Sequence, residues 1–308
     1  MTNRRAIWTF WIIALGLLSP SAGVWAHDAQ LQPDFSLPSI SFAHFKTAAA
    51  PSITVAPAAK PSLVDQWTKS VEYSVLLKQN GWKGWSYTST GAHPEIEWVE
   101  AHVAPTSEYR HQCEKSFTIG WAAVEAAAKS QSGELAVVLD IDETVMINMA
   151  FQREIIDGFD PKKWDAWVKR KEALAVPGAK EFLNKVRALG VHVVFMSDRA
   201  SDLDAYTIGN MKNLGLFADG DIVLSKTAKT DNKEVRRRCV TTGKNGEDAR
   251  CKTFEPMTII GLFGDSLRDH FEVYSREAAM RTLNNPRWGK ISFVLPNPMY
   301  GQWSNDYN

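Results

Sequence analysis

Residues 135–144 read LAVVLDIDET, an apolar run that ends in a cluster of acidic residues. Five consecutive apolar residues, from Leu135 to Leu139, are typical of a strand that is buried on both faces of a sheet. Asp140 would leave that strand first, and Asp142 lies two residues further on. Two carboxylates this close cannot both remain unpaired anions at low cost, so a cation binds there or one carboxylate carries a proton. For a lone Asp-x-Asp, the alternative is an acidic turn that caps the next helix.

Strands and helices alternate downstream of this run. We predict strands over residues 191–196, 221–224, 257–263 and 291–295, with helices following Pro177-Gly178 and over 201–214. The alternation predicts an α/β fold with a doubly wound parallel sheet. Ligands of such sheets bind beyond the carboxyl ends of the strands. Asp140, Ser197 and Asp265 each directly follow a predicted strand, so we expect them at one edge.

Other polar residues add to this expected site. Asp265 and Asp269 lie four apart where the chain enters a helix, which would put them on one face. Oxygen ligands without His or Cys favour Mg²⁺ over zinc. Ser197 could hold a phosphoryl oxygen or cap the next helix, and Thr144 could donate a hydrogen bond that shapes the loop. One of three lysines could neutralise the site, or all could lie on a solvated helix face: Lys226, Lys229 and Lys233.

The N-terminal part of the chain is organised differently. Residues 1–26 carry Arg4 and Arg5, an apolar run and a small-residue end, Val24-Trp25-Ala26, which is the pattern of a signal peptide. The apolar run is shorter than a membrane span needs, so we expect a periplasmic or secreted protein with no transmembrane anchor in the mature chain. Whether export uses the general or the twin-arginine route stays open. Residues 27–61, rich in Ala, Pro and Ser, are typical of a linker. We predict a domain over 62–308, with a helical extension at 62–130 and a core at 131–308.

Composition narrows the possible partners. Lys and Arg total 35, as do Asp and Glu, so the net charge is zero and nothing favours binding to a nucleic-acid polymer. The three cysteines lack zinc-binding spacing. In an oxidising compartment Cys239 and Cys251 could close the loop between them, whose residues 243–246 look like a hairpin tip, while Cys113 would stay unpaired. The oligomeric state stays open, a homo-oligomer included.

Together these motifs resemble the haloacid dehalogenase (HAD) superfamily of phosphotransferases. Within it the chain is most similar to the class C acid phosphatases, the bacterial lipoprotein-e type of 5′-nucleotidase, from about Trp67 to Trp303. The matching segments are 138–145 with Asn148, 176–179, 195–199, 232–236, 264–269 and 296–301. The chain departs from the family at three positions. Phe151 replaces the usual Tyr, Ser266 replaces Asn or Thr, and His270 replaces Phe. It also lacks a lipid-modified Cys.

The resemblance implies a Mg²⁺-dependent phosphomonoesterase that forms an aspartyl-phosphate. Asp140 would be the nucleophile, and Asp142 the acid and base whose backbone carbonyl also binds metal. Asp265 would be a metal ligand, supported by Asp269, and Lys233 the neutralising lysine. The residues that would bind substrate or its phosphate are Thr144, Ser197, Arg199, Trp167 and Tyr300.

The substrate is the most open point. Trp164 and Trp167 lie in an insert where this superfamily places specificity caps, and Tyr300 follows the last predicted strand. Trp167 and Tyr300 could stack on the base of a nucleoside monophosphate, although the two tryptophans could equally pack the cap onto the core. Sugar phosphates or broad aryl phosphates are the alternative substrates. Two other classes of protein are alternatives to a phosphatase: a receiver-like regulatory module, or a catalytically silent binding or storage protein.

Overall fold

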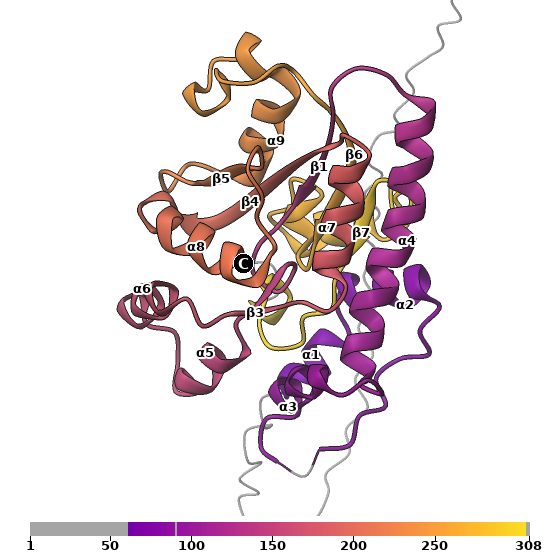
Figure 1. Cartoon of the computed structure of the whole chain (residues 1–308). Helices are drawn as coiled ribbons and strands as arrows, with labels where there is room; N and C mark the ends of the chain where they lie inside the picture. The colour runs from indigo at the N-terminus through magenta and orange to yellow at the C-terminus, as the bar shows by residue number, and fades with distance from the viewer. Residues whose placement is uncertain (1–60, 90, 306–308) are drawn as a thin grey trace, which may run out of the picture. The chain divides into compact units, whose positions relative to one another are not determined.

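The computed structural model in Figure 1 describes residues 61–89 and 91–305. The predicted signal peptide and the predicted linker, apart from Pro61, lie outside the described residues. Within those residues, no helix combines the length and apolar character needed to cross a membrane.

A five-stranded parallel sheet forms the centre of the fold. Its strands are β1 (Leu135–Leu139), β4 (His192–Ala200), β5 (Ile222–Lys226), β6 (Thr258–Gly264) and β7 (Ser292–Val294). Their order is β5-β4-β1-β6-β7, and every neighbouring pair is parallel. The predicted doubly wound α/β sheet is therefore confirmed. Every residue of β1 is buried because this strand lies in the middle of the sheet.

Helices cover both faces of the sheet, so alternate residues of β1 enter two separate cores. Leu135, Val137 and Leu139 belong to the core shared with α4 (Glu108–Ser130) and α7 (Ala179–Ala188). Ala136 and Val138 belong to the core shared with α9 (Lys233–Thr242). Figure 1 shows α4 and α7 side by side at one face of the sheet and α9 at the other.

The N-terminal extension is helical, as predicted, and is held by aromatic side chains. It comprises α1 (Leu63–Trp67), α2 (Val71–Asn80), α3 (Pro94–Glu100) and α4. The rings of Trp82 and Trp98 stack with their centroids 5.8 Å apart. Each indole N–H donates to a different carboxylate oxygen of Glu108 at 3.0 Å. Helix α4 begins at Glu108, where the side chain of Ser107 caps it by accepting from the backbone N–H of Arg110.

An insert follows β1 and carries two helices. Its ends form a small antiparallel pair, β2 (Met146–Ile147) with β3 (Leu174–Ala175). Between them lie α5 (Met149–Glu154) and α6 (Pro161–Arg170), which Figure 1 shows below the sheet, on the side of β3. The remaining helices are α8 (Asp204–Leu214), α10 (Arg276–Thr282) and the 3₁₀ helices η1 (Ala101–Val103), η2 (Ser201–Leu203), η3 (Gly243–Asn245), η4 (Ala249–Cys251), η5 (Leu267–Asp269) and η6 (Gln302–Asn305).

Two local predictions need correction. Ser197 does not follow its strand, because β4 continues to Ala200 with a change of register after Ser197. Residues 243–246 are not a hairpin tip: α9 runs to Thr242 and the 3₁₀ helices η3 and η4 follow. The predicted disulfide between Cys239 and Cys251 is confirmed, with Cα atoms 5.7 Å apart, and Cys113 is a buried free thiol.

Candidate functional site

Three carboxylates meet at the carboxyl ends of β1 and β6. Asp140 leaves β1 and its backbone N–H donates to the carbonyl of Phe263 at 2.9 Å, which extends the pairing of the two strands. Asp265 follows β6 directly, and Asp269 ends η5. One oxygen from each of these aspartates lies within 4.8 Å of the others. The adjacent parallel strands therefore bring together residues that are far apart in the sequence.

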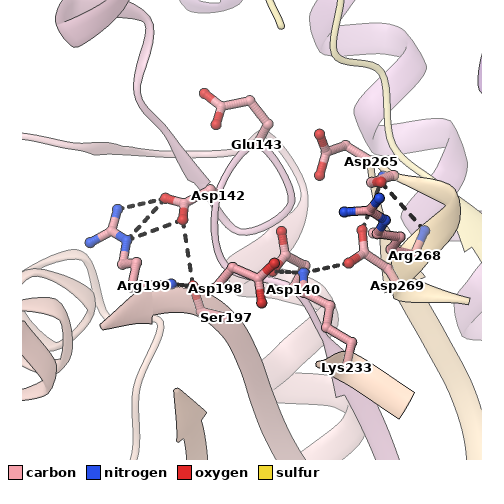
Figure 2. Close-up of polar contacts among 12 residues, drawn as sticks. Asp140, Asp142, Glu143, Ser197, Asp198, Arg199, Lys233, Asp265, Arg268 and Asp269 are labelled. Atoms are coloured by element: carbon pink, nitrogen blue, oxygen red, sulfur yellow. Dashed lines mark hydrogen bonds and ion pairs between the residues drawn. The ribbon is translucent and has the colours of Figure 1, made fainter. Parts of the chain in front are cut away.

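Lys233, at the start of α9, joins this cluster from the other side. Its Nζ lies 2.5 Å from Oδ1 of Asp140 and also contacts Asp269, and Figure 2 shows it between the two carboxylates. Burial alone would lower the pKa of Lys233, but the charges of Asp140 and Asp269 outweigh it and raise the pKa. Lys226 and Lys229 instead line a second cavity of about 130 Å³, on which Lys233 also borders.

The remaining contacts hold the aspartates in place. The backbone N–H of Ser266 donates to Oδ2 of Asp269 at 3.0 Å, and Nδ2 of Asn297 donates to Oδ2 of Asp265 at 2.8 Å. Burial raises the pKa of Asp140 and of Asp265, since it disfavours the charged forms. Sequence reasoning gave Asn297 no role, although it lies in the matching segment after the last strand.

Asp142 faces away from this cluster, toward Arg199 (Figure 2). Nε and Nη2 of Arg199 donate to Oδ1 of Asp142 at 3.0 and 2.7 Å. Nδ2 of Asn148 donates to the same oxygen at 2.7 Å, and Oγ of Ser197 lies 3.5 Å from Oδ2. Both oxygens of Asp142 are therefore engaged by donors.

Glu143, between the loop and the C-terminal segment, is a site residue that sequence reasoning passed over. It is buried, and its backbone has a positive φ of 56°, which is uncommon outside glycine. Its carboxylate accepts from Asn148 and from the hydroxyl of Tyr300. Burial raises the pKa of Glu143 to about 8. The only sequence signal was its place inside the acidic motif.

A cavity of about 510 Å³ opens above these residues. Its charged lining residues are Asp140, Asp142, Arg199, Lys233 and Asp265. Its apolar and aromatic lining residues come from the insert and the C-terminal segment: Phe151, Ile155, Phe159, Trp164 and Tyr300. The cavity can therefore hold a ligand with an anionic end and a planar or apolar end.

Residues 79–303, more than half of the chain, match the sequence model of the HAD superfamily, subfamily IIIB (Acid phosphatase). The chain belongs to this family. Among solved structures, the class C acid phosphatase from Bacillus anthracis is 27% identical, with a TM-score of 0.57 over 70% of this chain and 90% of that one. A second structure of that protein, with tungstate bound, has a TM-score of 0.56 at the same identity and coverage.

Several curated relatives of this acid phosphatase family member come from plants. The stem 28 kDa glycoprotein of Glycine max is 25% identical over 53% of this chain and 58% of that protein. Acid phosphatase 1 of Solanum lycopersicum is 26% identical over 53% of this chain and 57% of that protein. The chain thus spans somewhat over half the length of these relatives.

The structure does not bring every predicted residue of this family member to the cavity. Trp167 is 1% exposed and packs on Phe151, so it cannot stack on a ligand as expected, while Trp164 borders the cavity in its place. Thr144 is buried away from the cavity, and among the described residues its hydroxyl has no hydrogen-bond partner, so it does not shape the loop as expected. Ser197 is buried beneath Asp142, where its Oγ accepts from the N–H of Arg199 at 3.1 Å.

Proposed function

We propose that this protein is a phosphomonoesterase in which Asp140 is the nucleophile. The observation that carries the proposal is the position of Asp140 at the end of the central strand, ion-paired with Lys233 and bordering the cavity. Membership of an acid phosphatase family supports the reaction class. The tungstate bound to the Bacillus anthracis relative supports it further, because tungstate, like phosphate, is a tetrahedral oxyanion.

The chain's own residues then account for both halves of the reaction. An oxygen of Asp140 attacks phosphorus as the bond from phosphorus to the ester oxygen breaks, which leaves a phosphoryl group on Asp140. Asp142 gives a proton to the departing oxygen, then takes one from the water that attacks the same phosphorus. That second attack releases inorganic phosphate and restores Asp140. Lys233 would hold Asp140 and offset part of the negative charge.

The cluster of carboxylates fits a divalent cation. Asp140, Asp265 and Asp269 offer oxygens within 4.8 Å of one another, and carboxylate oxygens are the ligands that Mg²⁺ prefers. Lys233 brings one positive charge to the two carboxylates of Asp140 and Asp269, whereas Asp265 receives the neutral Asn297 amide. Asp140, Asp265 and the backbone carbonyl of Asp142 would hold Mg²⁺, with Asp269 in support. Bound Mg²⁺ would offset negative charge on the phosphoryl oxygens.

Nucleoside monophosphates are the substrates that the cavity suits best. Trp164 and Tyr300 line it together with the carboxylates, and an aromatic face can stack on any nucleobase. Sugar phosphates lack such a planar group, and aryl phosphates present a smaller one. Phosphate release should be measured across nucleoside monophosphates, sugar phosphates and aryl phosphates, with and without Mg²⁺. Activity on nucleotides no greater than on sugar phosphates would refute the nucleotide preference, and no release from any ester would refute the reaction.

We expect the protein to be exported to the periplasm or secreted, because residues 1–26 have the pattern of a signal peptide. Expression of the full chain in a bacterium, followed by N-terminal sequencing of the protein outside the cytoplasm, tests it. A start near His27 is expected. An uncleaved chain that stays in the cytoplasm would refute this expectation.

A further inference from the structure

Two buried side chains beside the catalytic loop have no role in the reaction described above. Glu143 and Asn148 are both fully buried. The backbone N–H of Asn148 donates to Oε1 of Glu143 at 2.7 Å, and its Nδ2 donates to Oε2 of Glu143 at 3.0 Å. The same Nδ2 also donates to Oδ1 of Asp142 at 2.7 Å. One amide group thus joins the two carboxylates.

The other end of the Asn148 amide contacts donors. Its Oδ1 accepts from Nη2 of Arg199 at 3.2 Å and lies 3.4 Å from Nε1 of Trp167. The nitrogen therefore faces two carboxyl groups and the oxygen faces a guanidinium and an indole N–H, which leaves the amide a single favourable orientation. Arg199 also binds Asp142 directly, so these three side chains form a closed ring of contacts.

Glu143 is itself held from several directions. Its backbone N–H donates to the carbonyl of Met146 at 2.7 Å, and its carboxylate accepts from the Tyr300 hydroxyl. A positive φ at a residue other than glycine persists only where the surroundings enforce it. Such strained backbone conformations are concentrated at functional sites, which is consistent with a role of Glu143 in holding the Asn148 amide beside Asp142.

We propose that Glu143 and Asn148 are positioning residues that orient the carboxyl group of Asp142 toward the leaving-group oxygen. This inference rests on the proposed acid role of Asp142. Arg199 donates to both oxygens of Asp142. The amide of Asn148, held in turn by Glu143, adds a second residue that donates to Oδ1 and so further restricts rotation of the carboxyl group. Proton transfer depends steeply on such orientation, since small misplacements of catalytic groups can cost about 100-fold in rate.

The dependence of the rate on the leaving group provides the test. Nitrophenolate departs readily without a proton, whereas an alkoxide needs one, so a misplaced acid slows alkyl esters selectively. We would measure kcat/KM for nitrophenyl phosphate and glycerol phosphate in Asn148→Ala and Glu143→Gln, because kcat/KM reports on the steps up to departure of the leaving group and not on the later hydrolysis that both esters share. Glutamine keeps the shape of Glu143 but offers one acceptor oxygen where the carboxylate offers two. We expect kcat/KM for glycerol phosphate to fall about 10- to 100-fold, with a much smaller loss on nitrophenyl phosphate.

Asn210→Ala is the matched control. Asn210 is also a buried asparagine, but its amide bonds to the backbone of Ala173: Oδ1 accepts from the Ala173 N–H and Nδ2 donates to the Ala173 carbonyl, each at 3.1 Å. Its loss should lower the melting temperature without altering the ratio of the two rates. If Asn148→Ala does not fold, Glu143→Gln decides. Equal losses on both esters, or no loss on either, in a folded variant would overturn the inference.

Asp142→Asn separates this inference from the proposed function. It should lower kcat/KM for glycerol phosphate far more than for nitrophenyl phosphate. If it does, and the Asn148 and Glu143 variants do not, then the positioning role is wrong while the acid role stands. If Asp142→Asn lowers kcat/KM for both esters equally, the acid role fails and the positioning role fails with it.

Discussion

The ammonium group of Lys233 lies 2.5 Å from a carboxylate oxygen of Asp140, although 93 residues separate the two in the chain. The contact is buried, and Asp269 flanks it on the other side of the ammonium group. A buried carboxylate without such a partner would favour its protonated form. The ion pair therefore favours the charged form of Asp140, which the proposed nucleophile requires, against burial, which raises the pKa of this carboxyl group.

Replacement of the proposed nucleophile gives the first prediction. Asp140→Asn is nearly isosteric, so the protein should fold while kcat falls by at least about 1,000-fold. Asp219→Asn, which changes a fully exposed aspartate, should keep wild-type activity. Steady-state kinetics on nitrophenyl phosphate and circular dichroism check both. A folded Asp140→Asn variant that keeps a tenth of the wild-type kcat would exclude the role of nucleophile.

The three lysines considered from the sequence provide the second prediction. Lys233→Met should abolish activity and destabilise the fold by about 3–5 kcal/mol, because it leaves buried carboxylates without their cation. Lys226→Met and Lys229→Met should change both quantities little, since neither side chain contacts Asp140. Urea unfolding and kcat would be measured for all three. An inactive Lys229 variant beside an active Lys233 variant would reverse the assignment.

Metal removal provides the third prediction. Exhaustive dialysis against EDTA should remove activity, and Mg²⁺ should restore it, because the carboxylates would otherwise lack a divalent cation. Asp265→Asn should raise the Mg²⁺ concentration needed for half-maximal activity by about 10- to 100-fold, which a titration of activity with Mg²⁺ measures. Full activity in the metal-free protein is the result that would contradict the proposed site.

The two tryptophans of the insert provide the fourth prediction. Trp164→Ala should raise KM for nucleoside monophosphates by roughly 5- to 150-fold, the range that corresponds to stacking energies of about 1–3 kcal/mol. KM for ribose 5-phosphate should barely change. Trp167→Ala should instead lower the melting temperature and affect both substrates alike, because Trp167 is buried in the insert. If Trp164→Ala weakens both substrates equally, its ring is structural and the nucleotide preference loses its support.

The disulfide provides the fifth prediction. Replacing Cys239 and Cys251 together by Ser should lower the free energy of unfolding by about 3 kcal/mol, as expected for a loop of this length. Cys113→Ser removes the buried free thiol and keeps the disulfide, so the free energy of unfolding of this variant should still fall when reductant is added. Urea unfolding with and without reductant checks both. Equal stability of the double variant and the wild type under oxidising conditions would mean that the bridge contributes nothing.

Much of the fold could be predicted because its signals are local. The apolar run at 135–139 can be buried on both sides only inside a parallel sheet, and alternating strands and helices connect such sheets. Asp140 and Asp265 were expected at one edge for the same reason, since parallel strands end at the same side. The exact ends of β4 and α4 could not be predicted, because pairing with β5 and the cap at Ser107 determine them.

The sequence by itself determined which residue types the site contains: acidic residues after two strands, a nearby lysine and aromatic residues in an insert. The tertiary structure decided which of them meet. It selected Lys233 from three lysines, turned Trp164 rather than Trp167 toward the cavity, and joined Glu143 to Tyr300 across 157 residues. The physical reason is that strand ends follow from short-range patterns, whereas side-chain partners depend on how helices and inserts pack around the sheet.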